Sequence, residues 1–514
     1  MVSEELKNYV QKALVSGRTK EEIRQDLFDV GWQEADVNEV FKIFEISIPR
    51  RIFGSPVFVG VIILLLLGAI FFLWQDRLDL SDTNAQKVRD FYSQLANSQV
   101  SFTDAGTMVF PDEQKFLDQK AEYIFDKKSF VEVNLRAMRL TLYENGTPIK
   151  EMTVLTKGKE GSWWETPTGN YSVLGKEINH FSSIGKVWMP YSIQFYGNFF
   201  IHGWPHYDDG AAVPSGYSGG CIRLSNEYAK EIFNFVDKNM PVLVLEDEGT
   251  VSFGLLKPKA KNAPLPAIKA ESFLISDLAS GEVILEKNAN ETLPIASLTK
   301  LMTGVVAHEM IYLGRVIKVT PRTLASAIQV FNISVGEYYQ GFDLLYPLLM
   351  QSSNDAAKTL SAFLGEQNFV NNMNTKAISL GMNDTRFVDA SGISAQDVST
   401  ADDLSKLLQY IYYKRRFLFD ISKGKVFDNV GLIKLGGTVD VGGLKNFNEF
   451  VGESDLVGMK NGETRAAGQT IATVWNIHTT QGDLPVAIII LNSQDRVVDT
   501  ENLLRWLKEN FEII

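Results

Sequence analysis

The hydrophobic positions at the start of the chain repeat with the period of a helix. Between residues 3 and 46, Thr19 and Glu22 form a capping box, which is a sequence signature of a helix start. Two groups of apolar residues follow at helical spacing: Ile23, Leu27 and Val30, then Val37, Val40 and Phe41. We therefore predict a small helical region at residues 1–50, which either docks a partner or is a plain folded cap.

A continuous apolar run follows this region. Residues 52–74 contain no charged side chain, and at helical rise they extend roughly 34 Å, enough to cross a bilayer. Arg50 and Arg51 precede the run and Asp76 follows it. Because basic residues favour the cytoplasmic side, the pattern predicts a single-pass protein of the cell membrane with a cytoplasmic N-terminus. A cleaved signal peptide or a buried core helix fits the run less well.

Beyond the apolar run the periodicity changes twice. Residues 76–127 are polar with a helical pattern and predict a helical stalk or a lead-in to the next domain. Over residues 128–248 apolar and polar residues alternate in short stretches, which is typical of strands, and Asn145-Gly146 predicts a hairpin turn. This stretch is therefore expected to be a mainly β domain.

The last part of the chain mixes helical and strand patterns. A segment rich in proline and lysine at residues 249–271 predicts a linker. Residues 272–514 then predict an α/β (α+β) domain. The expected fold class is thus multidomain: a helical N-terminal unit, one membrane helix, and two extracytoplasmic domains.

Length and composition agree with this division. The 514 residues suffice for two or three domains, and 45% hydrophobic with 22% charged residues is ordinary for globular proteins. The net charge of −12 argues against general nucleic-acid binding. A single cysteine excludes an intrachain disulfide.

That cysteine lies in a glycine-rich turn. Cys221 follows Ser218, Gly219 and Gly220, so the backbone can turn sharply and expose the thiol. A free cysteine is more often an inert core residue, because a nucleophilic thiol needs a base within hydrogen-bond reach. Among the five histidines, His202 ends an apolar strand and is best placed to be that base. We expect this base to increase the thiolate fraction at neutral pH.

These residues resemble the signature of the L,D-transpeptidase (YkuD) family, in which a histidine precedes a Ser/Thr-His-Gly-Cys motif. Here fifteen residues separate His202 from the stretch "SGGCIR". The stretch "ETPTGNYSVLGK" and the strand that ends at His202 extend the resemblance over residues 128–248. It implies that Cys221 is the nucleophile and His202 its base, with Ser218 and Gly220 in the substrate site.

One position departs from the family pattern. Gly219 stands where the family usually has a histidine. We expect an active but altered site, and the alternative is an inactive relic. Backbone N–H groups around Cys221 can stabilise a tetrahedral oxyanion. Arg223 either holds a substrate carboxylate or braces the turn.

The last region carries three short motifs with reactive side chains. Ser297 and Lys300 form an S-x-x-K motif, and on a helix this spacing places the hydroxyl and the amine on one face. A lysine can take the serine proton if burial or a second cation lowers its pKa. The other two motifs are Ser352-Ser353-Asn354 and Lys460-Asn461-Gly462.

The order and separation of these motifs resemble the serine D-Ala-D-Ala carboxypeptidases, the penicillin-binding peptidases of the S11 type. The resemblance covers about residues 272–511 and implies a penicillin-binding/β-lactamase-like fold. A β-lactamase function fits the motifs less well than a carboxypeptidase function. It implies that Ser297 is the acylated nucleophile and Lys300 its base. It further implies that Ser352 relays a proton and that Asn354 binds the substrate. It also implies a substrate-binding strand with Lys460, Asn461 and Gly462.

Together these patterns predict a membrane-anchored peptidoglycan enzyme with two catalytic domains. The serine site is expected to trim stem pentapeptides, and the cysteine site to form L,D-cross-links or to exchange the terminal residue. β-Lactams are expected covalent inhibitors, residues 1–50 could bind a cytoplasmic partner, and neither site needs a metal or an organic cofactor. Because Asn461 replaces the family's threonine, a D,D-endopeptidase with a weakened or inactive cysteine site stays open, as does a peptidoglycan-binding scaffold.

Overall fold

The computed structural model describes parts of the first 43 residues and most of the chain after residue 111. The described residues are 7, 10, 19–29, 34–43, 112–162, 164–246, 256–259, 264–311, 313–321, 333, 335–427, 444–479 and 482–513. They belong to two compact units, residues 1–86 and 87–514. The predicted membrane segment at 52–74 lies outside the described residues. Of the helices that are described, none combines the length and the apolar character that crossing a bilayer requires.

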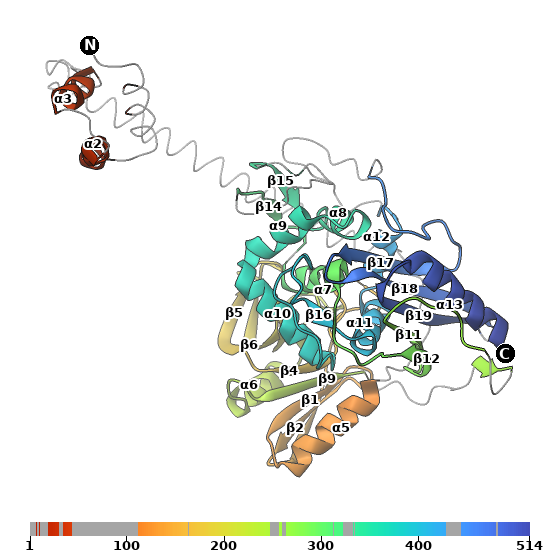
Figure 1. Ribbon diagram of the computed structural model, residues 1–514. Coiled ribbons are helices and arrows are strands. Elements are labelled where there is room, and N and C mark those ends of the chain that lie inside the picture. Colours follow the sequence, from red (N-terminus) through yellow and green to blue (C-terminus); the bar gives the residue numbers. More distant parts are fainter. Residues whose placement is uncertain are drawn as a thin grey trace. The chain divides into compact units, whose positions relative to one another are not determined.

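The first unit contains two described helices, shown in red in Figure 1: α2 (Lys20–Asp29) and α3 (Glu34–Ile43). Both begin and end close to the positions that the periodicity predicts. Their apolar side chains form one small buried cluster together with Val10, and the members from the two helices are Ile23, Leu27, Val37, Val40 and Phe41. The predicted helical spacing is therefore confirmed for the residues that the structure describes.

The second unit begins with a mainly β domain. One sheet has the strand order β3-β2-β1-β9-β4, with bounds Thr147–Thr153, Arg139–Glu144, Phe130–Asn134, Pro241–Leu245 and Gly169–Ser172. A second sheet has the order β5-β6-β7-β8, with bounds Gly175–Ser182, Val187–Tyr196, Phe199–His202 and Ile222–Arg223. Helices α5 (Asp112–Phe125) and α6 (Asn226–Phe235) accompany these sheets. Asn145 and Gly146 both have positive φ, as the predicted hairpin turn requires.

A helix of the predicted stalk or lead-in packs on this domain. Tyr123 of α5 forms a small core with Phe130, Tyr143 and Leu243, and its ring centroid lies 5.4 Å from that of Phe130. The amphipathic pattern of residues 112–125 thus marks a helix with an apolar face on the sheet, and the domain starts before residue 128.

The second domain is built on one antiparallel sheet, ordered β12-β11-β19-β18-β17, with bounds Val283–Lys287, Ser272–Asp277, Gly482–Ser493, Gly468–Thr479 and Leu456–Thr464. Alternate residues of β19 enter two different cores. Ala487 and Ile489 face a helical layer, whereas Ile488 and Ile490 face α13 (Arg496–Asn510). Both faces of the sheet are therefore covered (Figure 1).

The helical layer consists of one 3₁₀ turn and six helices among the described residues. They are η1 (Ala296–Leu298), α7 (Thr299–Met310), α8 (Leu345–Met350), α9 (Asn354–Leu364), α10 (Glu366–Ser379), α11 (Ala401–Lys414) and α12 (Phe417–Ser422). Three two-stranded sheets complete the domain: β13 (Leu293–Pro294) with β16 (Val398–Ser399), β14 (Val316–Lys318) with β15 (Tyr338–Gln340), and β10 (Leu256–Pro258) with β20 (Phe511–Ile513). This arrangement agrees with the predicted α/β (α+β) fold.

Part of the predicted linker is bound to the second domain. Strand β10 pairs with β20 at the C-terminal end, and the Trp506 indole donates to the carbonyl of Pro264 at 2.8 Å. Ala270 is fully buried. The proline and lysine pattern of this segment predicts an extended chain, but it does not reveal that the extended chain pairs with a strand.

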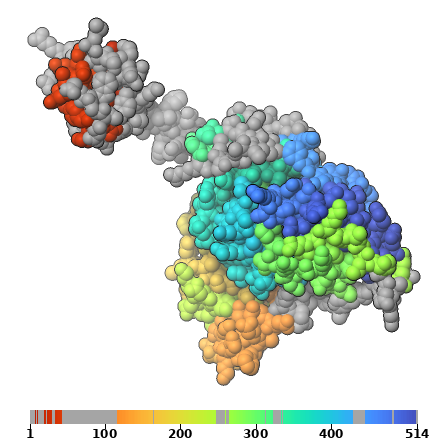
Figure 2. All heavy atoms as spheres, viewed as in Figure 1, coloured from red at the N-terminus to blue at the C-terminus, as the bar shows by residue number. Residues whose placement is uncertain are grey.

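The two domains of the second unit are in direct contact (Figure 2). The amine of Lys376 on α10 lies 3.2 Å from the hydroxyl of Tyr171 on β4, and the Asn198 amide donates to the carbonyl of Met310 at 2.9 Å. The sequence predicts only a linker, residues 249–271, between the two domains. Contacts between folded surfaces hold them together instead.

Candidate active sites

The cysteine lies beside the end of the strand that carries the histidine. Strands β7 and β8 pair in parallel, with Ile201 opposite Ile222 and His202 opposite Arg223. Cys221 directly precedes β8. The sheet therefore places the two predicted residues on or next to neighbouring strands, although fifteen residues separate His202 from Ser218 in the sequence.

The turn before Cys221 is fixed by hydrogen bonds and by close packing. The Ser218 hydroxyl donates to the Cys221 carbonyl at 2.5 Å and accepts from the Gly220 N–H at 3.1 Å. Gly220 has a φ of +100°, and an added Cβ would lie 2.4 Å from the Phe199 ring, so glycine is required there. At Gly219, in contrast, an added Cβ would meet nothing within 4 Å. The space that a histidine side chain would enter at this position is therefore open, and the turn has not repacked to fill it.

His202 has the protonation state of a general base. Its Nδ1 lies 2.6 Å from the Gly203 carbonyl, which can only accept, so Nδ1 carries the proton and Nε2 keeps its lone pair. Burial lowers the pKa of His202 to about 3, because the charged imidazolium would lose its hydration. At neutral pH the imidazole is therefore uncharged and can accept a proton.

The thiol is also uncharged at rest, which corrects the sequence expectation. Cys221 is partly exposed, yet the atoms around it raise the pKa of its thiol above the ordinary value by desolvation. Its sulfur lies 3.8 Å from the carbonyl oxygen of Asn198. The environment thus favours an uncharged thiol and an uncharged imidazole in the resting protein.

Arg223 contributes to the turn through its backbone and lies over an aromatic ring. Its carbonyl accepts from the Leu155 N–H at 2.8 Å, and its guanidinium lies 5.6 Å from the centroid of Trp204. Burial lowers the pKa of Arg223 below its ordinary value. The backbone bonds support the bracing role, and the carboxylate-binding role stays a prediction.

In the second domain, Ser297 and Lys300 meet as the S-x-x-K spacing predicts. Ser297 lies in η1 and Lys300 in the first turn of α7. The Lys300 amine donates to the Ser297 hydroxyl at 2.9 Å, to the Asn354 side chain at 2.8 Å and to the Ser391 carbonyl at 2.5 Å. Asn354 therefore belongs to the site, and Ser391 is a further member that the sequence motifs did not identify.

Burial makes Lys300 a usable base. The side chain is fully buried, and desolvation lowers the pKa of Lys300 to about 7. Desolvation also lowers the pKa of Lys460 well below its ordinary value, and the charge of Lys300 lowers it further. About half of the Lys300 amines are consequently neutral near pH 7, which is the form that takes a proton from serine.

Of the remaining motif residues, Gly462 lies next to Ser297. An added Cβ on Gly462 would lie 2.7 Å from the Ser297 nitrogen, so this glycine lets β17 approach the nucleophile. Ser352 has a φ of +58°. For a non-glycine residue, this backbone conformation costs roughly 1–3 kcal/mol of strain energy. It directly precedes Ser353, which caps α9 by accepting from the Ala356 N–H. The proton-relay role of Ser352 stays a prediction.

A charged group next to β17 was missed by sequence reasoning. Glu449 accepts from the Asn461 amide at 2.7 Å and pairs with Arg496 at 2.6 Å. Arg496, the first residue of α13, also donates to the Gly462 carbonyl at 3.0 Å. Lys460 donates to the Asn461 side-chain oxygen at 3.0 Å. No short motif links these positions, so the sequence carried no signal for them.

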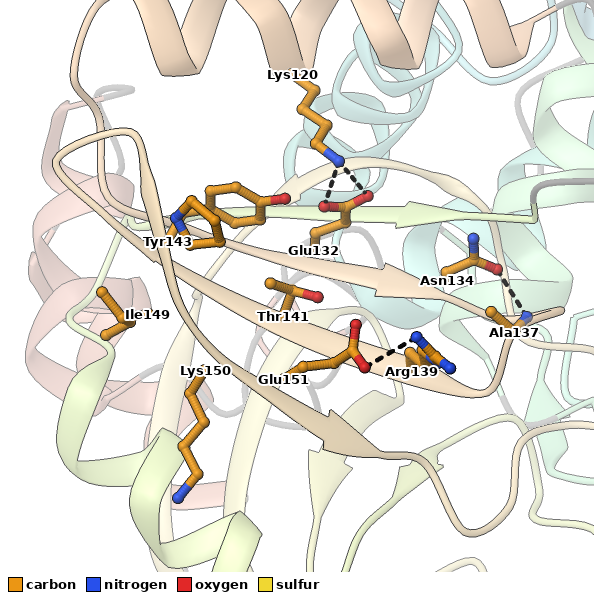
Figure 3. Close-up of a pocket in the computed structure, with 11 residues that line it drawn as sticks. Lys120, Glu132, Asn134, Ala137, Arg139, Thr141, Tyr143, Ile149, Lys150 and Glu151 are labelled. Carbon is orange, nitrogen blue, oxygen red and sulfur yellow. Dashed lines mark hydrogen bonds and ion pairs between the residues drawn. The ribbon is translucent and has the colours of Figure 1, made fainter.

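A polar pocket of about 530 Å³ lies on the first sheet of the first domain (Figure 3). Four of its charged side chains form two pairs within the lining: Lys120 lies 2.8 Å from Glu132, and Arg139 lies 2.9 Å from Glu151. Lys150 pairs with Glu231, which is outside the lining, at 2.6 Å. Its lining includes neither nucleophile. Across the described part of the chain, no group of three or more potential metal ligands occurs.

Comparisons with known proteins match each domain. Residues 258–495 match the family model of D-alanyl-D-alanine carboxypeptidase, Peptidase S11, and residues 128–244 match that of the L,D-transpeptidase catalytic domain, YkuD. The chain is 30% identical over 260 residues to the D-alanyl-D-alanine endopeptidase of Pseudomonas aeruginosa. The matched region covers 49% of this chain and 81% of that protein.

Two further similarities concern the same half of the chain. It is 29% identical over 268 residues to the D-alanyl-D-alanine carboxypeptidase DacC of Escherichia coli, which covers 48% of this chain and 64% of that protein. A solved structure of Penicillin-Binding Protein D2 from Listeria monocytogenes, in the cefotaxime-bound form, is 29% identical. It has a TM-score of 0.41 and covers 48% of this chain and 99% of that one.

The raised pKa of the thiol predicts the pH dependence of its alkylation. Because iodoacetamide reacts with the thiolate, the rate at Cys221 should rise with pH through a midpoint above that of free cysteine. His202→Ala should slow the reaction, and His206→Ala is the matched control. Mass spectrometry of the modified peptide measures the rate. A midpoint below that of free cysteine would contradict the neutral pair.

The lowered pKa of Lys300 predicts the pH dependence of serine acylation. The rate of covalent labelling by a fluorescent penicillin should increase with pH through a midpoint near 7, as the Lys300 amine loses its proton. Ser297→Ala should abolish the label, which gel fluorescence measures. Labelling of Ser297→Ala as strong as that of the unchanged protein would disprove the nucleophile.

Proposed function

Because the chain belongs to the D-alanyl-D-alanine carboxypeptidase family and carries an L,D-transpeptidase catalytic domain, we propose that it is a bifunctional, membrane-anchored peptidoglycan enzyme. The observation that carries the proposal is the buried Lys300 amine at 2.9 Å from the Ser297 hydroxyl. The proposed second site is built on Cys221, which lies in the turn next to the strand that pairs with the His202 strand.

At the serine site, neutral Lys300 takes the proton of Ser297, and the serine oxygen attacks the carbonyl between the two terminal D-alanines of a pentapeptide stem. The peptide bond breaks, and the departing D-alanine amine receives a proton, for which Ser352 is the proposed relay. Water then hydrolyses the acyl-enzyme to a tetrapeptide. The nucleophile and base are thus connected before the substrate binds.

At the cysteine site, His202 takes the thiol proton through Nε2, and the sulfur attacks the carbonyl that precedes the fourth residue of a tetrapeptide. The fourth residue leaves as the thioester forms. An amine from a second stem, or a free D-amino acid, then attacks the thioester and releases the thiol. The product of the Ser297 site would therefore be the donor for the Cys221 site.

The location of the enzyme follows from the apolar segment. Residues 52–74 would anchor the protein as a single membrane span, with residues 1–50 in the cytoplasm, where they could bind a partner. Both catalytic domains would then lie outside the membrane, next to newly made peptidoglycan. β-Lactams would acylate Ser297 as substrate analogues.

The proposed relay has a direct test with purified muropeptides. The unchanged protein should convert pentapeptide to L,D-cross-linked or exchanged product. Cys221→Ala should stop at the tetrapeptide, and Ser297→Ala should process only added tetrapeptide, because it cannot make its own donor. Chromatography with mass spectrometry measures the products. If Ser297→Ala cross-links pentapeptide at the unchanged rate, the two sites are independent, and absence of all activity would favour the scaffold.

One observation favours a D,D-endopeptidase as a second candidate function. The Glu449 carboxylate is held by the Asn461 amide and by Arg496, next to the strand that approaches Ser297. The resemblance assigns the substrate's terminal carboxylate to this end of the Lys-x-Gly strand. Glu449 would compete for the same donors, and cross-linked substrates without a terminal carboxylate there would not meet this competition.

A matched pair of substrates separates the two functions. Glu449→Gln should raise kcat/KM for a peptide ending in D-Ala-D-Ala by roughly tenfold, because the Glu449 carboxylate would no longer compete with the substrate carboxylate. A tenfold change corresponds to about 1.4 kcal/mol of binding free energy. It should leave kcat/KM unchanged for the same peptide with a C-terminal amide. Glu463→Gln is the control, because Glu463 is more exposed and lies 3.5 Å from the same guanidinium. A lower rate for the acid substrate would show that Glu449 orients Arg496 instead.

A further inference from the structure

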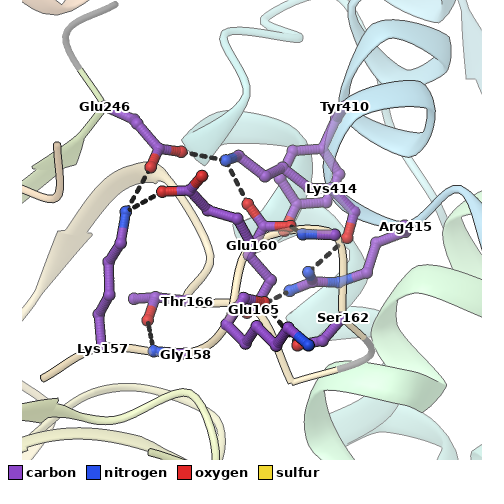
Figure 4. Close-up of polar contacts among 12 residues, drawn as sticks. Lys157, Gly158, Glu160, Ser162, Glu165, Thr166, Glu246, Tyr410, Lys414 and Arg415 are labelled. Atoms are coloured by element: carbon purple, nitrogen blue, oxygen red, sulfur yellow. Dashed lines mark hydrogen bonds and ion pairs between the residues drawn. The ribbon is translucent and has the colours of Figure 1, made fainter. Parts of the chain in front are cut away.

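A buried cluster of charged side chains joins the two catalytic domains (Figure 4). Lys414, the last residue of α11, pairs with Glu165 and with Glu246 of the first domain. Side-chain exposures are 4% for Lys414, 4% for Glu165 and 3% for Glu246. Lys157 of the first domain pairs with the other oxygen of Glu246 at 2.6 Å.

The charges in this cluster depend on one another. Burial alone would lower the pKa of Lys414, but Glu165 and Glu246 raise it above its ordinary value. Burial alone would raise the pKa of Glu246, but Lys414 and Lys157 hold it below its ordinary value. Burial also raises the pKa of Glu165 above its ordinary value, although Lys414 opposes this. Removal of Lys414 would therefore leave Glu165 without its cation, either protonated or displaced, whereas Glu246 would keep Lys157. The loop that carries Glu165 would lose the contact that holds it to the second domain.

That same loop supports the turn that carries the thiol. Thr166, next to Glu165, donates to the Gly220 carbonyl at 2.9 Å and accepts from the Gly158 N–H at 2.9 Å. On the other side of the loop, the Lys157 carbonyl accepts from the Ser218 N–H at 2.9 Å. The residues that face Lys414 and the residues that hold the thiol turn are therefore neighbours in one short segment.

A second contact reaches the thiol from helix α7. The Asn198 amide donates to the carbonyl of Met310, the last residue of α7, and the Asn198 carbonyl oxygen lies 3.8 Å from the Cys221 sulfur. At Gly197 an added Cβ would lie 2.8 Å from the Glu309 carbonyl, so the two backbones touch. The other end of α7 carries Lys300.

We propose that Lys414 and Arg415, which belong to the serine-peptidase domain, are positioning residues for the Cys221 site. Lys414 fixes the Glu165 side chain, and Arg415 donates to the Glu165 carbonyl at 3.4 Å while its Nε binds Glu309 at 2.9 Å. The thiol turn is thus built from both domains. The inference rests on the proposed thiol chemistry, but alkylation tests it without any transpeptidase turnover.

The test compares variants of the full-length protein by the pH midpoint of Cys221 alkylation. Lys414→Met should lower the midpoint toward that of free cysteine, because a loosened turn exposes the thiol to water. It should also slow exchange of the terminal residue of a tetrapeptide by roughly ten- to a hundredfold. Penicillin labelling at Ser297 should stay unchanged. Lys414→Arg keeps the cation and should restore the midpoint.

A second variant and a control make the result decisive. Thr166→Val removes the hydroxyl that holds Gly220 and leaves the charged cluster intact, so it should shift the midpoint in the same direction. Lys406→Met is the matched control, because Lys406 lies on the same helix and pairs with Asp402 at 2.8 Å and with Asp403. The midpoint should not move in this control.

The inference is overturned if Lys414→Met and Thr166→Val both leave the alkylation midpoint in place, or if Lys406→Met moves it as far. If Lys414→Met does not fold, Thr166→Val alone decides. Lys414→Met could show normal penicillin labelling and a shifted alkylation midpoint while the unchanged protein shows no exchange activity. That outcome would support the positioning role and reject the transpeptidase function. Loss of penicillin labelling in Ser297→Ala alone bears on the serine site and leaves this inference unaffected.

Discussion

The buried carboxylate of Glu309 anchors the contact between the domains. It lies at the end of α7, fully buried, with Lys376 at 3.1 Å and Arg415 at 2.7 Å. Burial alone would raise the pKa of Glu309, but these two cations lower it to about 2. Each cation then reaches the first domain: Lys376 contacts the Tyr171 hydroxyl, and Arg415 contacts the Glu165 carbonyl. Loss of one member of such a set typically costs about 3–5 kcal/mol.

The same physical effect, desolvation, has opposite consequences at the two nucleophiles. At Lys300 it destabilises the charged form and so produces a base near neutral pH. At Cys221 it destabilises the thiolate and so keeps the nucleophile neutral. A buried, neutral His202 completes the second arrangement, because an imidazolium there would be as unfavourable as a thiolate. In the proposed mechanism the serine site has its base before substrate binds, whereas the cysteine site would separate charge during the reaction.

Much of this organisation could be predicted from local patterns. The i,i+3 spacing of Ser297 and Lys300 placed both groups on one helical face, and the glycine before Cys221 indicated a sharp turn. The charges between the domains could not be predicted, because Glu165 and Lys414 lie 249 positions apart and neither belongs to a motif. Asn461 likewise showed a departure from a family pattern, but the sequence did not show that Glu449 binds its amide.

The charged contact between the domains also has a consequence for how such a protein can change over generations. If either domain were exchanged for a homologous one, the new surface would have to supply partners for Lys414 or for Glu165 and Glu246 at the same positions. A mismatch would bury an uncompensated charge, which strongly disfavours folding. The two halves are therefore expected to be inherited and to diverge together, with substitutions at these positions compensating one another across the boundary.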